Sequence, residues 1–233
     1  MVLMKKEIFY LLGPKGDGCE TLPAYGSEAS YHFPFVRLPW RCNNCGQPFD
    51  GTKGVDIKID VTEKYLAKQR PLTFADCLHV DLIWEPFIRT VPTHILDRDI
   101  HFGNVLRPDG THIEDWLTCR CRYDLQLRGT GKGGTSVRKI TICKDCGYVR
   151  WSSQSPFFLY PAPPDDADIF QCSGDLLFRE SVYQYLDMEQ WKKKVYVTKI
   201  KVADKPLDGL DLPQFEIPRD LKWVAEHPEI ERC

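Results

Sequence analysis

Two short cysteine motifs carry the clearest chemistry in this chain. Cys42 and Cys45 are separated by two residues and followed by Gly46, and Cys143 and Cys146 repeat this pattern before a second glycine. Two intervening residues let both thiolates of one tight turn face the same ion, and the glycine permits a backbone that points its N–H groups at the sulfurs. Four thiolates around a tetrahedral Zn²⁺ form a closed structural site with no open position for water. We therefore predict one structural zinc ion held by Cys42, Cys45, Cys143 and Cys146.

A redox-active C-x-x-C pair and four unliganded thiols are the alternatives to zinc. A redox motif starts a helix, occurs once and needs no glycine after its second cysteine, so the duplicated C-x-x-C-G pattern favours a metal. The two pairs are separated by the 97 residues from 46 to 142, whereas compact ribbons separate theirs by about 15 to 20. The sequence thus predicts a split zinc ribbon, with residues 47–142 inserted between its two knuckles.

Cys119 and Cys121 are a competing source of metal ligands. They stand two residues apart in a strand-like run. We interpret them as strand residues whose thiols lie on opposite faces, so that at most one of them could join a shared ion. The remaining cysteines are isolated, and we interpret them as small apolar residues or as an exposed thiol at the tail; they are Cys19, Cys77, Cys172 and Cys233.

No enzyme constellation is found in the sequence. The glycine-rich residues 129–135 fail the phosphate-loop pattern because a glycine follows Lys132. Cys77 and His79 are neighbours in sequence, but no orienting partner for a cysteine nucleophile is indicated. The histidines also lack the spacing of a catalytic zinc helix. We therefore predict that the protein is not an enzyme.

The elements that would position the knuckles are mainly short strands. Residues 55–61 alternate apolar and polar side chains, and residues 116–127 and 137–142 flank a glycine loop as in an antiparallel hairpin. Apolar residues within 173–193 recur near helical spacing, which predicts the longest helix. Strands are expected at residues 8–12, 55–61, 116–127, 137–142, 169–171 and 195–202, and helices at 63–69, 73–79 and 173–193. The predicted fold is α+β, mostly antiparallel β, with the split zinc ribbon and a C-terminal helix–strand unit.

Length, composition and net charge limit the domain organisation and the partners that the chain can have. It has 233 residues, 42% of them hydrophobic, and a formal net charge of −2. We predict a single domain over residues 1–202 and an acidic, proline-containing tail over residues 203–233. The net charge gives no reason to expect nucleic acid or an anionic membrane as the default partner. Neither a leader nor an apolar run of about 18 residues is found, so we expect a cytoplasmic protein that does not span a membrane.

At its paired C-x-x-C-G elements the chain resembles the bacterial double-CXXCG motif family. That family includes immunity proteins of contact-dependent toxin systems in predatory soil bacteria. The resemblance covers most of the chain in order: a short N-terminal strand, residues 42–46, a variable middle, residues 143–147, residues 168–170 and the unit 176–202. The tail and the Cys119–Cys121 pair depart from the family pattern. The resemblance implies a zinc-binding immunity protein that neutralises a cognate toxin by binding it.

A nucleic-acid-binding zinc ribbon is the alternative function. Residues 105–150 hold nine Lys or Arg and five Asp or Glu, a local excess of basic charge that could contact phosphates. The tail instead holds eight Asp or Glu against four Lys or Arg. We hypothesise that the tail, together with Asp165, Asp166 and Asp168, contributes to binding a basic toxin surface.

Overall fold

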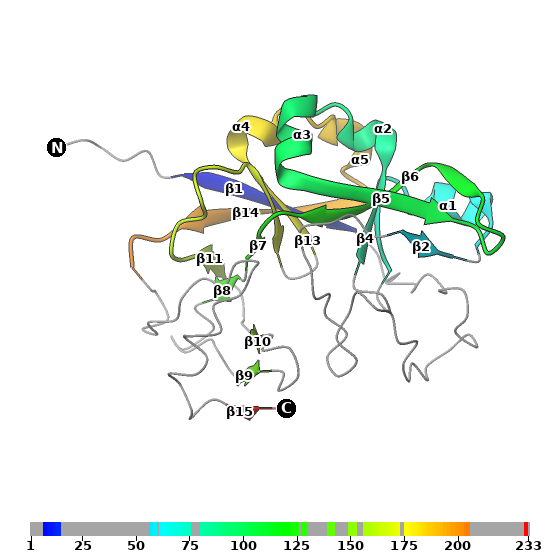
Figure 1. The fold of residues 1–233 in the computed structure, drawn as a ribbon. Coiled ribbons are helices and arrows are strands. Elements are labelled where there is room, and N and C mark those ends of the chain that lie inside the picture. The colour runs from blue at the N-terminus through cyan, green and yellow to red at the C-terminus, as the bar shows by residue number, and fades with distance from the viewer. Residues whose placement is uncertain are drawn as a thin grey trace.

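The computed structural model describes residues 7–14, 56–59, 61–75, 80–125, 127–129, 139–142, 149–152, 156–172, 175–205 and 231–232. Within these ranges the chain forms three sheets and five short helices (Figure 1). The expected α+β class is confirmed in this broad sense. The sheets are mixed, because strand pairs of both directions occur in each of them.

The largest sheet has seven strands in the order β7-β12-β13-β1-β14-β11-β8. Their bounds are β1 Ile8–Pro14, β7 Asp124–Leu125, β8 Arg128–Gly129, β11 Phe157–Leu159, β12 Ile169–Cys172, β13 Asp175–Arg179 and β14 Val195–Val202. β1 lies at the centre and pairs antiparallel with β13 and β14. Phe9 and Leu11 pack into the core on one face of this sheet, and Leu12 packs on the other. A strand with apolar side chains on both faces is stable only inside a sheet that is covered on both sides.

The long helix expected at residues 173–193 is wrong in its first part, where β13 forms instead. Leu176 and Phe178 pack against one core cluster, whereas Leu177 packs against the other. A strand buried on both faces has consecutive apolar residues, which periodicity alone cannot distinguish from a buried helix. Two helices of four residues, α4 Glu180–Tyr183 and α5 Met188–Trp191, follow the strand. The strands expected at 8–12, 169–171 and 195–202 are confirmed as β1, β12 and β14.

The second sheet has the order β2-β5-β6-β4-β3. Its strands are β2 Ile57–Lys58, β3 Leu72–Ala75, β4 Val80–Trp84, β5 Ile100–Leu106 and β6 His112–Cys121. β6 pairs with β5 and β4, so the hairpin expected between residues 116–127 and 137–142 is wrong. The helix expected from residue 73 is also wrong, because residues 73–75 belong to β3, which pairs with β4. Ile57 and Ile59 are buried and Lys58 is exposed, as the alternating pattern predicts.

The helices are short and lie against the sheets. α1 Glu63–Gln69 has the bounds that the sequence predicts, and Thr62 caps its N-terminus by accepting a hydrogen bond from the Tyr65 N–H at 3.2 Å. α2 Glu85–Ile88 and α3 Thr93–Asp99 lie on the same side of the sheets as α4 and α5 (Figure 1). Among the described helices, none is long and apolar enough to cross a bilayer.

A small third sheet contains β9 Lys139–Ile142, β10 Val149–Ser152 and β15 Glu231–Arg232. β9 pairs antiparallel with β10, and β15 pairs parallel with β9. Two residues of the predicted tail therefore belong to a sheet. The domain boundary placed at residue 202 remains a prediction.

Candidate functional site

The four predicted zinc ligands, Cys42, Cys45, Cys143 and Cys146, lie outside the described residues. The strands around the second pair are described. β9 ends at Ile142 and β10 begins at Val149, and these two residues are register partners in an antiparallel pair. Residues 143–148 therefore connect the two strands of a hairpin, which is where a zinc knuckle belongs. Within the described ranges, no group of three or more His, Cys, Asp or Glu side chains could hold a metal ion.

Cys119 and Cys121 are buried thiols of β6. The interpretation of this pair as strand residues is confirmed, since both belong to the core cluster that also contains Phe87 and Phe178. The expectation that their thiols lie on opposite faces is wrong. Residues two apart in a strand share a face, and the Cys119 and Cys121 side chains are hydrogen-bonded to each other. Burial raises the pKa of the Cys121 thiol well above its ordinary value, which favours the protonated thiol.

A network of arginines and aspartates holds residues 164–168, which we call the acidic loop, against the fold. At its centre is Asp99 at the end of α3, whose side chain is fully buried. Its carboxylate accepts hydrogen bonds from the backbone N–H groups of Asp168, at 2.8 Å, and Ile169, at 3.0 Å. Arg98 donates to both oxygens of Asp99 and, through Nη2, to Asp168 Oδ2 at 2.6 Å. The Asp99 hydrogen bond is the main cause that raises the pKa of Arg98.

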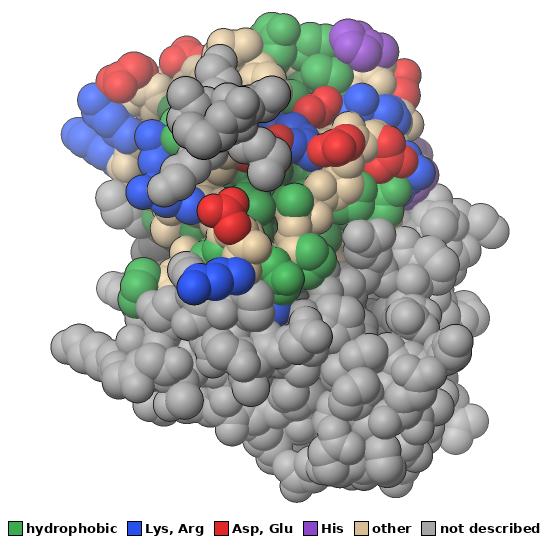
Figure 2. Space-filling model, turned by 90° about the vertical axis from the view of Figure 1, so that its left-hand side faces the viewer, with side chains coloured by type: hydrophobic (Ala, Val, Ile, Leu, Met, Phe, Trp, Pro, Cys, Tyr) green, Lys and Arg blue, Asp and Glu red, His purple; other side chains and the backbone are tan. Residues whose placement is uncertain are grey.

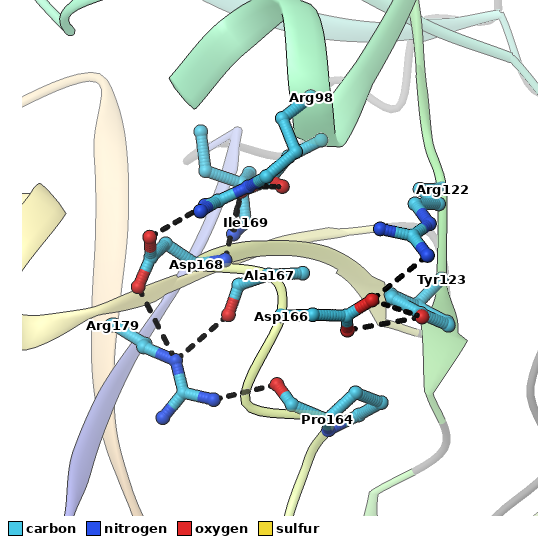
Figure 3. Close-up of polar contacts among 10 residues, drawn as sticks. Arg98, Arg122, Tyr123, Pro164, Asp166, Ala167, Asp168, Ile169 and Arg179 are labelled. Carbon is cyan, nitrogen blue, oxygen red and sulfur yellow. Dashed lines mark hydrogen bonds and ion pairs between the residues drawn. The ribbon is translucent and has the colours of Figure 1, made fainter. Parts of the chain in front are cut away.

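Arg179 at the end of β13 holds the acidic loop from the other side (Figure 3). Its Nε donates to the Ala167 carbonyl at 2.8 Å, and its Nη2 donates to the Pro164 carbonyl at 2.7 Å. The guanidinium lies over the rings of Phe9 and Phe170, with its Cζ 5.1 and 5.8 Å from their centroids. Because these bonds go to backbone carbonyls, they fix the path of the loop rather than one side chain.

The aspartates of the acidic loop differ in how much of their charge is compensated. Asp166 pairs with Arg122 at 2.8 Å and accepts a hydrogen bond from the Tyr123 hydroxyl at 3.0 Å, yet its side chain is 55% exposed. Asp168 is paired with Arg98. The Asp165 side chain is fully exposed, and its one described ion pair is a long contact of 3.7 Å with Arg179.

The network as a whole has more acidic than basic groups. Three arginines, Arg98, Arg122 and Arg179, face five carboxylates, those of Glu7, Asp99, Asp165, Asp166 and Asp168, which leaves a surplus of two negative charges. Acidic and basic side chains are interspersed over the described part of the face shown in Figure 2. The acidic loop is thus a fixed backbone segment whose most exposed group is a carboxylate.

A second cluster of polar side chains lies where the two larger sheets meet. The Gln171 amide on β12 donates to the buried Asp81 carboxyl on β4 and, at 3.4 Å, to the Asp175 carbonyl on β13. The Tyr196 hydroxyl on β14 donates to the Asp175 carboxyl. Burial raises the pKa of Asp81 well above its ordinary value and raises the pKa of Asp175 to about 6. Their hydrogen bonds connect β4, which lies within the predicted insert of residues 47–142, with strands outside it.

Sequence reasoning singled out Asp165, Asp166 and Asp168 but missed the arginines that hold them. Arg98 and Asp168 are 70 residues apart, and no local pattern relates them. The one available signal was the position of Arg98 in the last turn of a helix, where a basic residue is favourable for reasons unrelated to the loop.

No family model, no curated protein and no solved structure matches this chain. Membership of the double-CXXCG family therefore remains a prediction that rests on the residues quoted above.

Proposed function

We propose that this protein is a zinc-binding immunity protein that neutralises a cognate bacterial toxin by direct binding. The observation that carries the proposal is the fixed acidic loop. Backbone bonds from Asp99 and Arg179 hold its course, and Asp165 projects fully into solvent. A loop that is ordered before binding loses little conformational entropy when a partner docks.

The charge of the loop suits a basic partner surface. Asp166 and Asp168 are paired with arginines of the protein itself, so Asp165 is the carboxylate most available to a partner. An acidic surface accelerates encounter with a basic one, and this acceleration weakens as salt screens the charges. Nucleases carry basic substrate clefts, which makes a nuclease toxin a suitable partner.

Zinc has a structural role in this proposal. Four cysteine thiolates are the donor set of a closed zinc site, and the β9–β10 hairpin supports a knuckle at Cys143 and Cys146. The predicted insert joins the two knuckles, so the ion would tie distant segments of the chain together.

The test is a binding measurement between the zinc-loaded full chain and the product of the adjacent open reading frame. Asp165→Asn removes the exposed charge without a change in side-chain shape. We expect it to slow association several-fold at low salt and to reduce the salt dependence of the association rate. Asp187→Asn, which removes an exposed charge next to α5, is the matched control and should leave both unchanged.

Two results would overturn the proposal. One is the absence of a complex with the adjacent gene product, combined with salt-dependent binding of arbitrary DNA or RNA, which would favour the nucleic-acid-binding alternative. The other is an association rate that neither Asp165→Asn nor a change in salt affects, since the acidic loop would then lie outside the interface.

A further inference from the structure

A pocket of about 370 Å³ lies between α1 and the start of β6. Ligand pockets for small molecules begin at about this size. Leu66 and Trp116 contribute apolar lining, and most of the remaining lining residues are charged or titratable: Glu63, Arg70, Arg107, His112, Glu114 and Asp115. None of the described residues of the acidic loop lines this pocket.

One wall of the pocket is an irregular stretch of β6. Leu106 is the register partner of His112, but Asn104 is the partner of Leu117, so residues 113–116 stand opposite Val105 alone. All four of these residues line the pocket. Asp115 has a φ of 62°, a left-handed conformation that non-glycine residues rarely adopt within a strand. Bulges and such strained residues concentrate at binding sites, where they redirect side chains.

Arg70, on the α1 side of the pocket, has a guanidinium whose Nε has no acceptor. Its Cζ lies 4.4 Å from the ring centroid of Trp84, and its Nε is buried with no hydrogen-bond partner. No carboxylate in the described part of the chain pairs with it. Arg107 differs, because it is bonded to Glu63 and donates to the His112 carbonyl at 2.9 Å. An arginine with a buried N–H group that lacks an acceptor favours an anionic ligand, above all a carboxylate that its planar fork can bind with two hydrogen bonds.

Glu114 and Asp115 supply the opposite charge. Both are exposed, and within the described ranges neither side chain has a hydrogen bond or an ion pair. After the Arg107–Glu63 pair is set aside, the lining offers one cation, Arg70, and two carboxylates that form no ion pair with any other residue that the structure describes. A simple anion would satisfy Arg70 but would be repelled by the two acids. A ligand that carries one carboxylate and one or two cationic groups complements all three side chains.

We propose that this pocket binds a basic amino acid, with its α-carboxylate on Arg70 and its cationic groups at Glu114 and Asp115. The same chemistry is present in a free amino acid and in the basic C-terminal residue of a peptide. Only the free amino acid has an α-ammonium group in addition to the side-chain cation. Acetylation of that amine therefore distinguishes the two sources.

Isothermal titration calorimetry of the full chain, with L-lysine and L-arginine as probes, tests the proposal. Acetate carries only the carboxylate and n-butylamine only one cationic group, so each should bind far more weakly than either probe. Arg70→Gln and Asp115→Asn should each weaken probe binding about tenfold or more, since each removes one charge-assisted contact. Asparagine tolerates the left-handed conformation of residue 115, so Asp115→Asn should keep the fold. Asp97→Asn, an exposed charge on α3, is the matched control.

Titration with Nα-acetyl-L-lysine tests whether the α-ammonium group contributes to binding. Equal binding of L-lysine and its acetylated form supports the pocket and assigns the ligand to a peptide C-terminus, whereas loss on acetylation assigns it to a free amino acid. If Arg70→Gln does not fold, Asp115→Asn and Glu114→Gln still decide the question. Absence of binding heat for both probes at about 10 mM, or unchanged affinity in both of these acid variants, overturns the proposal.

Discussion

Gln171 connects the buried carboxyl group of Asp81 with the backbone of Asp175. It donates to the Asp81 carboxyl on β4 and to the backbone carbonyl of Asp175 on β13. Burial disfavours the charged form of a carboxyl group, which is why burial raises the pKa values of both acids. The two larger sheets thus meet at groups whose charge depends on pH.

Stability should fall as the pH rises through the pKa of Asp175. This pKa is raised from 3.8 to about 6 in the folded protein, so the folded state holds the proton more tightly than the unfolded chain does. The contribution is therefore favourable below the unfolded pKa and is lost between about pH 4 and 6, at a cost of about 1–3 kcal/mol. Urea unfolding across this pH range should show that the free energy of unfolding falls less in Asp175→Asn than in the parent protein. Asp187→Asn should behave like the parent. If the free energy of unfolding depends on pH equally in Asp175→Asn and in the parent, Asp175 is not the group responsible.

Gly13 on β1 is required by its neighbours rather than by its backbone conformation. A Cβ at this position would overlap the Asp175 carboxylate and the Tyr196 ring. Because the Tyr196 hydroxyl donates to the Asp175 carboxyl in a partly buried pair, neither group can move away freely. Gly13→Ala should lower the free energy of unfolding by about 1–3 kcal/mol, measured by chemical denaturation. Thr198→Ala, at an exposed position of β14, should change it far less, and equal effects would show that residue 13 has room for a methyl group.

At the scale of elements, alternation of apolar and polar side chains predicts a strand more securely than a run of consecutive apolar residues. β2 and β14 alternate apolar and polar side chains and were predicted. β13 was mistaken for a helix because Leu177 and later apolar residues recur near helical spacing, whereas Leu176, Leu177 and Phe178 are consecutive and buried in the strand. β6 was paired with the wrong strand because its true partners, β4 and β5, are chosen by long-range packing. Local periodicity contains no information about either choice.

The acidic loop depends on Asp99 for its attachment to α3. Asp99→Asn keeps the shape of the side chain but replaces one acceptor oxygen by a donor and leaves Arg98 less well compensated. The free energy of unfolding of this variant, measured by urea denaturation, should be about 2–4 kcal/mol lower than that of the parent protein. It should also increase hydrogen exchange at the Asp168 and Ile169 amides, which donate to Asp99. Asp97→Asn on the same helix is the control, and unchanged exchange at both amides would contradict this role of Asp99.

At the scale of the whole molecule, one core joins the predicted insert to the rest of the chain. Leu12, Phe87 and Phe178 belong to the same buried cluster although Phe87 lies within residues 47–142. The sequence offers a hypothesis about metal ligands because the spacing within each C-x-x-C pair is local. The arginine–aspartate network and the α1–β6 pocket could not be predicted, since their residues meet only after distant segments have packed. Zinc would therefore add a second connection to a core that already crosses the boundary of the insert.

Removal of the predicted zinc should weaken the fold as a whole. We expect about one zinc per chain by elemental analysis of the native protein. Cys143→Ser should lose the metal and lower the free energy of unfolding by several kcal/mol, because metal-binding energy becomes folding energy when the site joins distant segments. Cys233→Ser, which removes the tail thiol, is the matched control and should keep full zinc content. Less than about a tenth of an equivalent of metal in the native protein, or metal loss in Cys233→Ser, would contradict the set of Cys42, Cys45, Cys143 and Cys146.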